Sequence, residues 1–175
     1  MEENKLILVT NDDGVYAPGI AALVEAMLPL GEVIVAAPAQ PQSGMSQAIT
    51  VIHPLRVKKS KLKACTSYAI NGTPTDAVKL ALNQLLSRKP DLLVSGINHG
   101  SNSSTSVLYS GTLGAALEGA VNGIPSIGFS LLSYDPATSL EASKVYAREI
   151  ASAVLKNGLP KFTCLNVNIP EGTMD

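Results

Sequence analysis

Two adjacent carboxylates, Asp12 and Asp13, follow a run of apolar and β-branched residues near the start of the chain. Residues 6–10 have the pattern of a buried strand, and the turn-forming Asn-Asp-Asp-Gly ends that strand abruptly. Neighbouring carboxylates repel each other, and neither Lys nor Arg lies within the next ten residues to offset the repulsion. Because Asp oxygens are hard ligands, a bound Mg²⁺, Mn²⁺ or Ca²⁺ would turn this repulsion into an attraction. The pair is therefore a candidate metal site.

A hairpin turn is the alternative interpretation of this segment, since Asp-Gly is a standard signal for a two-residue β-turn. The residues that follow favour the metal site, because they predict a helix and not a strand that pairs back. That helix is expected to begin at Pro18 and to end between Pro29 and Gly31. Its apolar residues at helical spacing are Ala21, Leu23, Val24 and Met27.

Small oxygen-bearing side chains follow two further predicted strands. Residues 32–37 form the second strand and lead into a loop that contains Ser43, while residues 91–98 form a third strand that ends at Asn98. Strand, helix and strand within about 30 residues predict a parallel βαβ unit. Because the carboxyl ends of parallel strands meet at one edge of a sheet, we expect these side chains to converge with the two carboxylates as ligands for Mg²⁺ or Mn²⁺. A plain turn serine is the alternative for Ser43.

A second candidate site is the start of a helix rich in small residues. Ser110, Gly111 and Thr112 open this helix, which is expected to extend to Ala120. Free backbone N–H groups and the helix dipole at such a start both favour a bound phosphate. A simple helix cap is the alternative. His99 precedes this helix and could transfer a proton, although simple loop polarity is the favoured interpretation.

The remaining elements are those of an α/β protein: a Rossmann-like three-layer fold with a mainly parallel central sheet, in a single domain of residues 1–175. A second capped helix is expected to begin after Thr73 and to end near Arg88. The other expected elements are short strands at 49–52, 55–59, 67–70 and 126–130, a helix at 140–156 and a last strand at 164–169.

The composition argues against several classes of partner. The net charge is −1 with 15% charged residues, so no overall electrostatic attraction to nucleic acid or anionic lipid is expected. The one basic cluster, Lys58, Lys59, Lys61 and Lys63, has no interleaved aromatic residue and is interpreted as a solvated loop. The start of the chain is polar, and no run approaches the roughly 18 apolar residues that span a membrane. We therefore expect a cytoplasmic protein without a nucleic-acid polymer or membrane partner.

The chain also resembles the SurE family of stationary-phase survival proteins in a series of ordered motifs that extend over most of its length. These motifs are Val9-Thr10-Asn11-Asp12-Asp13-Gly14, Ser43-Gly44, Asn71-Gly72-Thr73-Pro74-Thr75-Asp76, Ser95-Gly96-Ile97-Asn98-His99-Gly100 with Asn102, and Tyr109-Ser110-Gly111-Thr112-Leu113-Gly114-Ala115-Ala116 with Glu118-Gly119. The resemblance implies a Rossmann-like, metal-dependent phosphatase that acts on nucleoside 5'-monophosphates, and possible action on 3'-monophosphates is part of the same hypothesis.

The resemblance also implies roles for individual residues. It implies one divalent metal ion per subunit, Mg²⁺ or Mn²⁺, with Asp12, Asp13, Ser43 and Asn98 as ligands. It further implies that Asn102 and the turn formed by Ser110, Gly111 and Thr112 hold the phosphate. Family members often have glycine at the position of Ser104, so a slightly different path is expected for this loop.

The resemblance extends to assembly. Family chains usually continue for several tens of residues past the position of Asp175, and that extension is associated with arm exchange between subunits. A homodimer or homotetramer is therefore expected if the family arrangement is kept, while the present sequence is expected to lack the extension.

The mechanism that follows from these expectations is phosphomonoester hydrolysis. A metal held by the aspartates would polarise a phosphoryl oxygen and lower the pKa of a bound water that attacks phosphorus in line with the leaving alkoxide. Asp13 is the candidate acceptor of that water's proton, and donors from Asn98, Asn102 and the helix start would stabilise the developing charge. The alternative is a catalytically weak module that binds metal and nucleotide but needs the C-terminal part for activity. A signalling receiver domain is disfavoured, because residues 51–57 supply no phosphoacceptor Asp.

Overall fold

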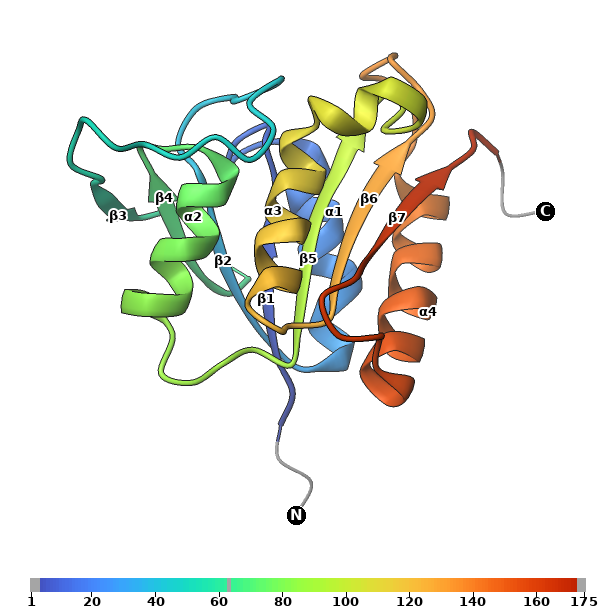
Figure 1. The fold of residues 1–175 in the computed structure, drawn as a ribbon. Coiled ribbons are helices and arrows are strands. Elements are labelled where there is room, and N and C mark those ends of the chain that lie inside the picture. Colours follow the sequence, from blue (N-terminus) through green and yellow to red (C-terminus); the bar gives the residue numbers. More distant parts are fainter. Residues whose placement is uncertain (1–3, 63, 173–175) are drawn as a thin grey trace.

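One mostly parallel sheet forms the centre of the molecule (Figure 1). The computed structural model describes residues 4–62 and 64–172, so the polar start at residues 1–3, Lys63 of the predicted basic cluster and residues 173–175 lie outside the described residues. The described strands are β1 (Leu6–Thr10), β2 (Glu32–Pro38), β3 (Val57–Lys59), β4 (Thr66–Ile70), β5 (Leu92–His99), β6 (Ser126–Leu131) and β7 (Cys164–Ile169). Their order across the sheet is β3-β4-β2-β1-β5-β6-β7, and only β3, at one edge, pairs antiparallel with its neighbour.

Helices cover both faces of this sheet, which gives the three predicted layers. Helices α1 (Pro18–Met27) and α4 (Glu141–Asn157) pack together on one face, and α2 (Pro74–Leu80) and α3 (Gly111–Val121) pack together on the other. A short π-helix, η2 (Ala81–Leu85), continues α2, and two 3-10 helices, η1 (Leu28–Leu30) and η3 (Ser104–Leu108), complete the described helical elements. The predicted α/β class and sheet are therefore confirmed.

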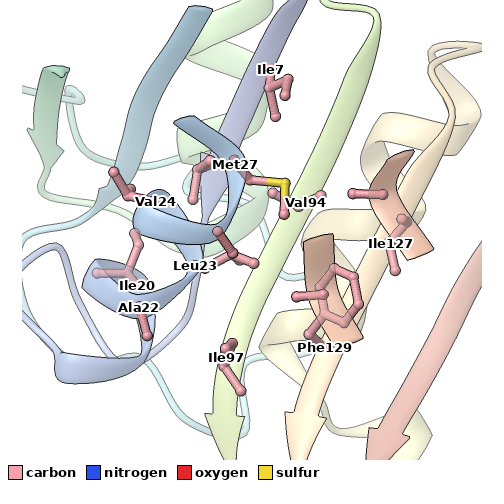
Figure 2. Close-up of a cluster of buried hydrophobic side chains, with 14 of the residues drawn as sticks. Ile7, Ile20, Ala22, Leu23, Val24, Met27, Val94, Ile97, Ile127 and Phe129 are labelled. Atoms are coloured by element: carbon pink, nitrogen blue, oxygen red, sulfur yellow. The ribbon is translucent and has the colours of Figure 1, made fainter. Parts of the chain in front are cut away.

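The larger hydrophobic core lies between α1, α4 and the sheet (Figure 2). On α1, Leu23 and Met27 are fully buried and face Val94 of β5 and Phe129 of β6. Every residue of β1 is buried, because a central strand of a parallel sheet is covered by helices on both faces. This explains why β1 reads as a continuous apolar run, and it makes the carboxyl end of β1 a rigid support for the residues that follow.

Helix α2 begins with the predicted cap. The Thr73 side chain accepts a hydrogen bond from the Asp76 N–H, and the Asp76 carboxylate accepts one from the Thr73 N–H. This reciprocal pair satisfies two backbone donors that would otherwise have no partner. Pro74 occupies the first helical turn, where a missing N–H costs nothing.

The predicted strand at residues 49–52 is wrong. The backbone N–H and the hydroxyl of Thr50 both donate to the Asp76 carboxylate, at 3.0 and 2.6 Å, so this segment is attached to the start of α2 and not to a neighbouring strand. Val51 and Ile52 remain 80% and 88% exposed. The strand predicted at 55–59 is shorter than expected, because only Val57–Lys59 (β3) pairs with β4.

None of the described helices is both long and apolar enough to cross a membrane.

Candidate active site

A cavity of about 270 Å³ opens at the carboxyl edge of the sheet. Six of the predicted site residues line it: Asp12, Asp13, Ser43, Asn98, Asn102 and Ser110. The other lining residues are Gly44, His99, Gly100, Ser101, Ser106, Tyr109 and Tyr134. The loops after β1, β2 and β5 thus meet at one place, as expected for parallel strands.

The turn after β1 is stabilised by the side chain of Asn11 and by a contact with the loop after β2. The Asn11 side chain donates to the Gly14 carbonyl at 2.9 Å and accepts from the Gly14 N–H at 3.2 Å. The N–H of Gln42 donates to the carbonyl of Asp12 at 2.7 Å. The segment that contains Ser43 is therefore hydrogen-bonded directly to the backbone of Asp12.

Asp12 is only 4% exposed, and its surroundings fix its carboxylate. The Thr112 hydroxyl donates to Oδ1 of Asp12 at 2.6 Å. Helix α3 approaches so closely that a Cβ on Gly111 would lie 2.8 Å from the Asp12 Cβ. Burial raises the pKa of Asp12 to about 6, the Thr112 hydrogen bond opposes this increase, and the charge of Asp13 adds to it. In the absence of a cation, ionisation of Asp12 is therefore costly.

Asp13 is partly buried beside Asp12 and has a histidine neighbour. Burial raises the pKa of Asp13, and the charge of His99 opposes this increase. The buried Nδ1 of His99 has no hydrogen-bond partner in the described part of the chain. His99 therefore belongs to the site, although simple loop polarity was the favoured interpretation of its sequence.

Asn98 lines the cavity, and its side-chain amide is held by backbone carbonyls. Its side-chain nitrogen donates to the carbonyls of His99 and Gly100, at 3.1 and 2.9 Å. Both amide hydrogens are thereby used, so the side-chain oxygen is the atom available to a cation or a substrate donor. The pairing of β5 with β6 shifts register between Ser95 and Asn98, and such an irregularity changes the direction of the side chains that follow it.

The start of α3 differs in detail from the expectation. Ser110 caps the helix, since its hydroxyl accepts from the Leu113 N–H at 3.1 Å. Gly111 and Thr112 are buried and are not among the residues that line the cavity. The Thr112 hydroxyl contacts Asp12, so it positions a carboxylate. Phosphate binding by Gly111 and Thr112 stays a prediction.

Asn102 connects its loop to the neighbouring strands. Its N–H donates to Asn168 of β7 at 2.9 Å, and its side-chain nitrogen donates to the Ser130 hydroxyl of β6 at 2.8 Å. Asn166 of β7 donates to the Asn102 carbonyl at 2.7 Å. The nearby Ser104 has φ of +54°, a left-handed conformation that glycine adopts without strain. The backbone at Ser104 therefore suits the glycine that the resemblance expects there.

The available ligands suit a hard divalent cation. Asp12, Asp13, Ser43 and Asn98 offer two carboxylates, a hydroxyl and an amide oxygen around one cavity. Among the described residues, no cluster of three or more His, Cys, Asp or Glu side chains could hold a metal. A ligand set of this kind suits Mg²⁺ or Mn²⁺, which accept few carboxylates and complete their coordination with water and substrate oxygens.

Comparison with known proteins gives a consistent match. The sequence profile of the family described as "Survival protein SurE" matches residues 7–175. A protein named 5'-nucleotidase SurE from Bacteroides thetaiotaomicron is 54% identical over 173 residues, which are 98% of this chain and 67% of the relative. A protein of the same name from Bacteroides fragilis is 54% identical over 171 residues, with 96% of this chain and 67% of the relative covered.

A solved structure supports the same match at the level of the fold. The SurE protein from Aquifex aeolicus superposes with a TM-score of 0.87 and 40% sequence identity, over 95% of this chain and 66% of the solved chain. The present chain thus spans about two thirds of the length of its relatives.

Proposed function

This chain belongs to the SurE family, and we propose that its cavity at the carboxyl edge of the sheet hydrolyses nucleoside 5'-monophosphates to nucleoside and phosphate with the help of one divalent cation. The names of the similar proteins, 5'-nucleotidase SurE, support the reaction. Since the chain spans about two thirds of these relatives, the activity of the whole protein enters here as a proposal.

One observation carries the need for a cation. Two carboxylates, Asp12 and Asp13, line the cavity, and no Lys or Arg is found among its described lining residues. A phosphate dianion that enters this cavity meets negative charge without a fixed positive side chain to offset it. A divalent cation held by these carboxylates would offset this repulsion. We propose Mg²⁺ or Mn²⁺, because every candidate ligand atom is an oxygen.

In this proposal Asp12, Asp13, Ser43 and Asn98 hold the cation. When bound, the cation supplies Lewis acidity at a phosphoryl oxygen and makes a nearby water more acidic. The hydrogen bond from Thr112 keeps the Asp12 carboxylate in one orientation, so little reorganisation is needed when substrate binds.

The remaining residues act on the substrate. A carboxylate oxygen of Asp13 accepts the proton of the attacking water as the water oxygen bonds to phosphorus. The P–O bond to the nucleoside breaks in line with this attack, and the released nucleoside oxygen takes up a proton from solvent. The side-chain amide of Asn102 and the hydroxyl of Ser110 line the cavity and donate to the phosphoryl oxygens on which charge accumulates. The residues of the proposed site bind the phosphoryl group and not the carbon that carries it. We therefore propose that the same reaction extends to 3'-monophosphates whose sugar fits the cavity.

We also propose that the protein acts in the cytoplasm and assembles as a homodimer or homotetramer, as the family resemblance implies. Light scattering after size-exclusion chromatography measures the assembly directly. A monomer at micromolar concentration would contradict it.

The proposed activity is tested by phosphate release from 5'- and 3'-monophosphates of adenosine, guanosine, cytidine and uridine. The protein is stripped of metal and then resupplied with Mg²⁺ or Mn²⁺. Asp12→Asn is the test variant and Glu149→Gln, an exposed residue of α4, is the matched control. If the wild-type protein binds nucleotide after metal is resupplied but releases no phosphate, the proposed enzymatic activity is refuted. The chain would then be a module that binds metal and nucleotide without catalysis.

A further inference from the structure

Two exposed tyrosines line a cavity whose other lining residues are polar or small. Tyr109 is 65% exposed and Tyr134 is 80% exposed, and both share the cavity with the carboxylates Asp12 and Asp13. Binding of a phosphate and a cation requires oxygen ligands and N–H donors, not aromatic rings. The aromatic surface therefore fits another part of the substrate.

The ring of Tyr134 is held in place although most of it is exposed. A Cβ on Gly100 would lie 2.3 Å from Cε1 of this ring, so the ring packs directly on the backbone that follows Asn98. The loop around Tyr134 is also fixed, because the Ser133 hydroxyl bonds to the Thr138 hydroxyl at 2.8 Å and accepts from the Asp135 N–H at 3.2 Å. An aromatic surface fixed in this way loses little conformational entropy when a ligand binds to it.

Tyr134 and Asn98 are connected through Gly100. The Asn98 side chain donates to the Gly100 carbonyl at 2.9 Å, and the Tyr134 ring covers the same glycine. The proposed ligand of the cation and the aromatic ring thus contact one residue. A nucleotide whose phosphate lies at the carboxylates has its sugar and base close to the site, within reach of this ring.

We infer that Tyr134 binds the base of the nucleotide by stacking, and that this contact separates nucleotides from other phosphomonoesters. The inference rests on the proposed function. Stacking uses the π-face that every base has, so it favours all four common bases without hydrogen-bond recognition of any one. Phosphate esters without a ring, such as ribose 5-phosphate, gain nothing from it.

The test compares AMP with ribose 5-phosphate, which shares the sugar and the phosphate but lacks the base. We expect the ratio of kcat/KM for AMP to that for ribose 5-phosphate to fall about 5- to 100-fold in Tyr134→Ala, mainly through KM. Tyr134→Phe keeps the aromatic face and is expected to keep the ratio within about 2-fold. Tyr146→Ala, an exposed tyrosine on α4, is the matched control.

An unchanged ratio in Tyr134→Ala, or a loss confined to Tyr109→Ala, would overturn the assignment. A loss in Tyr134→Phe equal to that in Tyr134→Ala would also overturn it, because the hydroxyl and not the ring would then be responsible. Calorimetric titration with AMP and with ribose 5-phosphate in the presence of Mg²⁺ measures the corresponding ratio of dissociation constants. Wild-type protein without turnover would refute the proposed function, while the binding ratio would still decide the role of Tyr134.

Discussion

The substitution Asp12→Asn is predicted to stabilise the metal-free protein while it abolishes activity. Asp12 is 4% exposed, and its pKa is raised from 3.8 to about 6, chiefly by burial. Each pKa unit corresponds to about 1.4 kcal/mol, so the ionised side chain costs the fold about 3 kcal/mol at neutral pH. Asparagine has no charge to bury and can still accept from Thr112. Because its own NH₂ group must find partners, we expect a net gain of about 1 to 3 kcal/mol.

The pH dependence identifies the cause of this gain. The folded-state pKa of Asp12 lies above its unfolded value, so the unfolded chain releases the proton first as pH rises. The stability contributed by the protonated side chain is complete below 3.8 and is lost as pH rises to about 6. The gain from asparagine should therefore be close to zero at pH 4 and largest above pH 6.5.

Urea denaturation of the metal-stripped proteins, followed by circular dichroism at pH 4 and pH 8, measures this difference. Asp91→Asn is the control of opposite sign: burial would raise the pKa of Asp91, but hydrogen bonds from the Leu6 N–H and Arg88 outweigh burial and lower it. That variant should lose stability at pH 8. An Asp12→Asn protein that is no more stable than wild type at pH 8, or equally stabilised at both pH values, would show that the buried charge of Asp12 does not destabilise the fold.

Two further predictions concern buried hydrogen bonds. Thr112→Val removes the 2.6 Å hydrogen bond to Asp12 and should lower kcat/KM by about 10- to 100-fold. Thr112→Ser keeps the hydroxyl and should retain most activity. Equal losses of activity in the two variants would contradict the positioning role of Thr112. Asp76→Asn should cost about 2 kcal/mol of unfolding free energy at pH 7, because Asp76 caps α2 and accepts from Thr50. Burial would raise the pKa of Asp76, but hydrogen bonds from Thr50 and Thr73 outweigh it and lower the pKa, so this cost should shrink as pH falls through the lowered value. Urea denaturation at pH 7 and pH 3 measures the change, and a cost that is the same at both would show that the charge of Asp76 is not the cause.

The elements that the sequence predicted well are those whose pattern reflects burial. β1 is apolar throughout because both faces are covered, and α2 carries its cap in adjacent residues. The segment at residues 49–52 has strand-forming composition, yet its hydrogen bonds go to Asp76, which lies 26 residues further along the chain. No local pattern specifies such a contact.

The candidate site was predictable to the extent that topology determines it. Asp12 and Asn98 follow neighbouring parallel strands, so their meeting follows from the order of the strands. The contact of Thr112 with Asp12 joins residues 100 positions apart and depends on how closely α3 packs on the turn. The position of Tyr134 at the cavity could not be predicted from the sequence, because no local pattern marks it and its exposure there depends on the folded chain.

The proposed role of Asp12 is tested by phosphate release from AMP by metal-stripped protein, before and after addition of Mg²⁺ or Mn²⁺. Turnover is expected to return with the metal in wild-type protein and in Glu149→Gln, and to stay absent in a folded Asp12→Asn variant. Turnover by the stripped protein, or full metal-dependent turnover by Asp12→Asn, would contradict the claim that the buried carboxylate holds the catalytic cation.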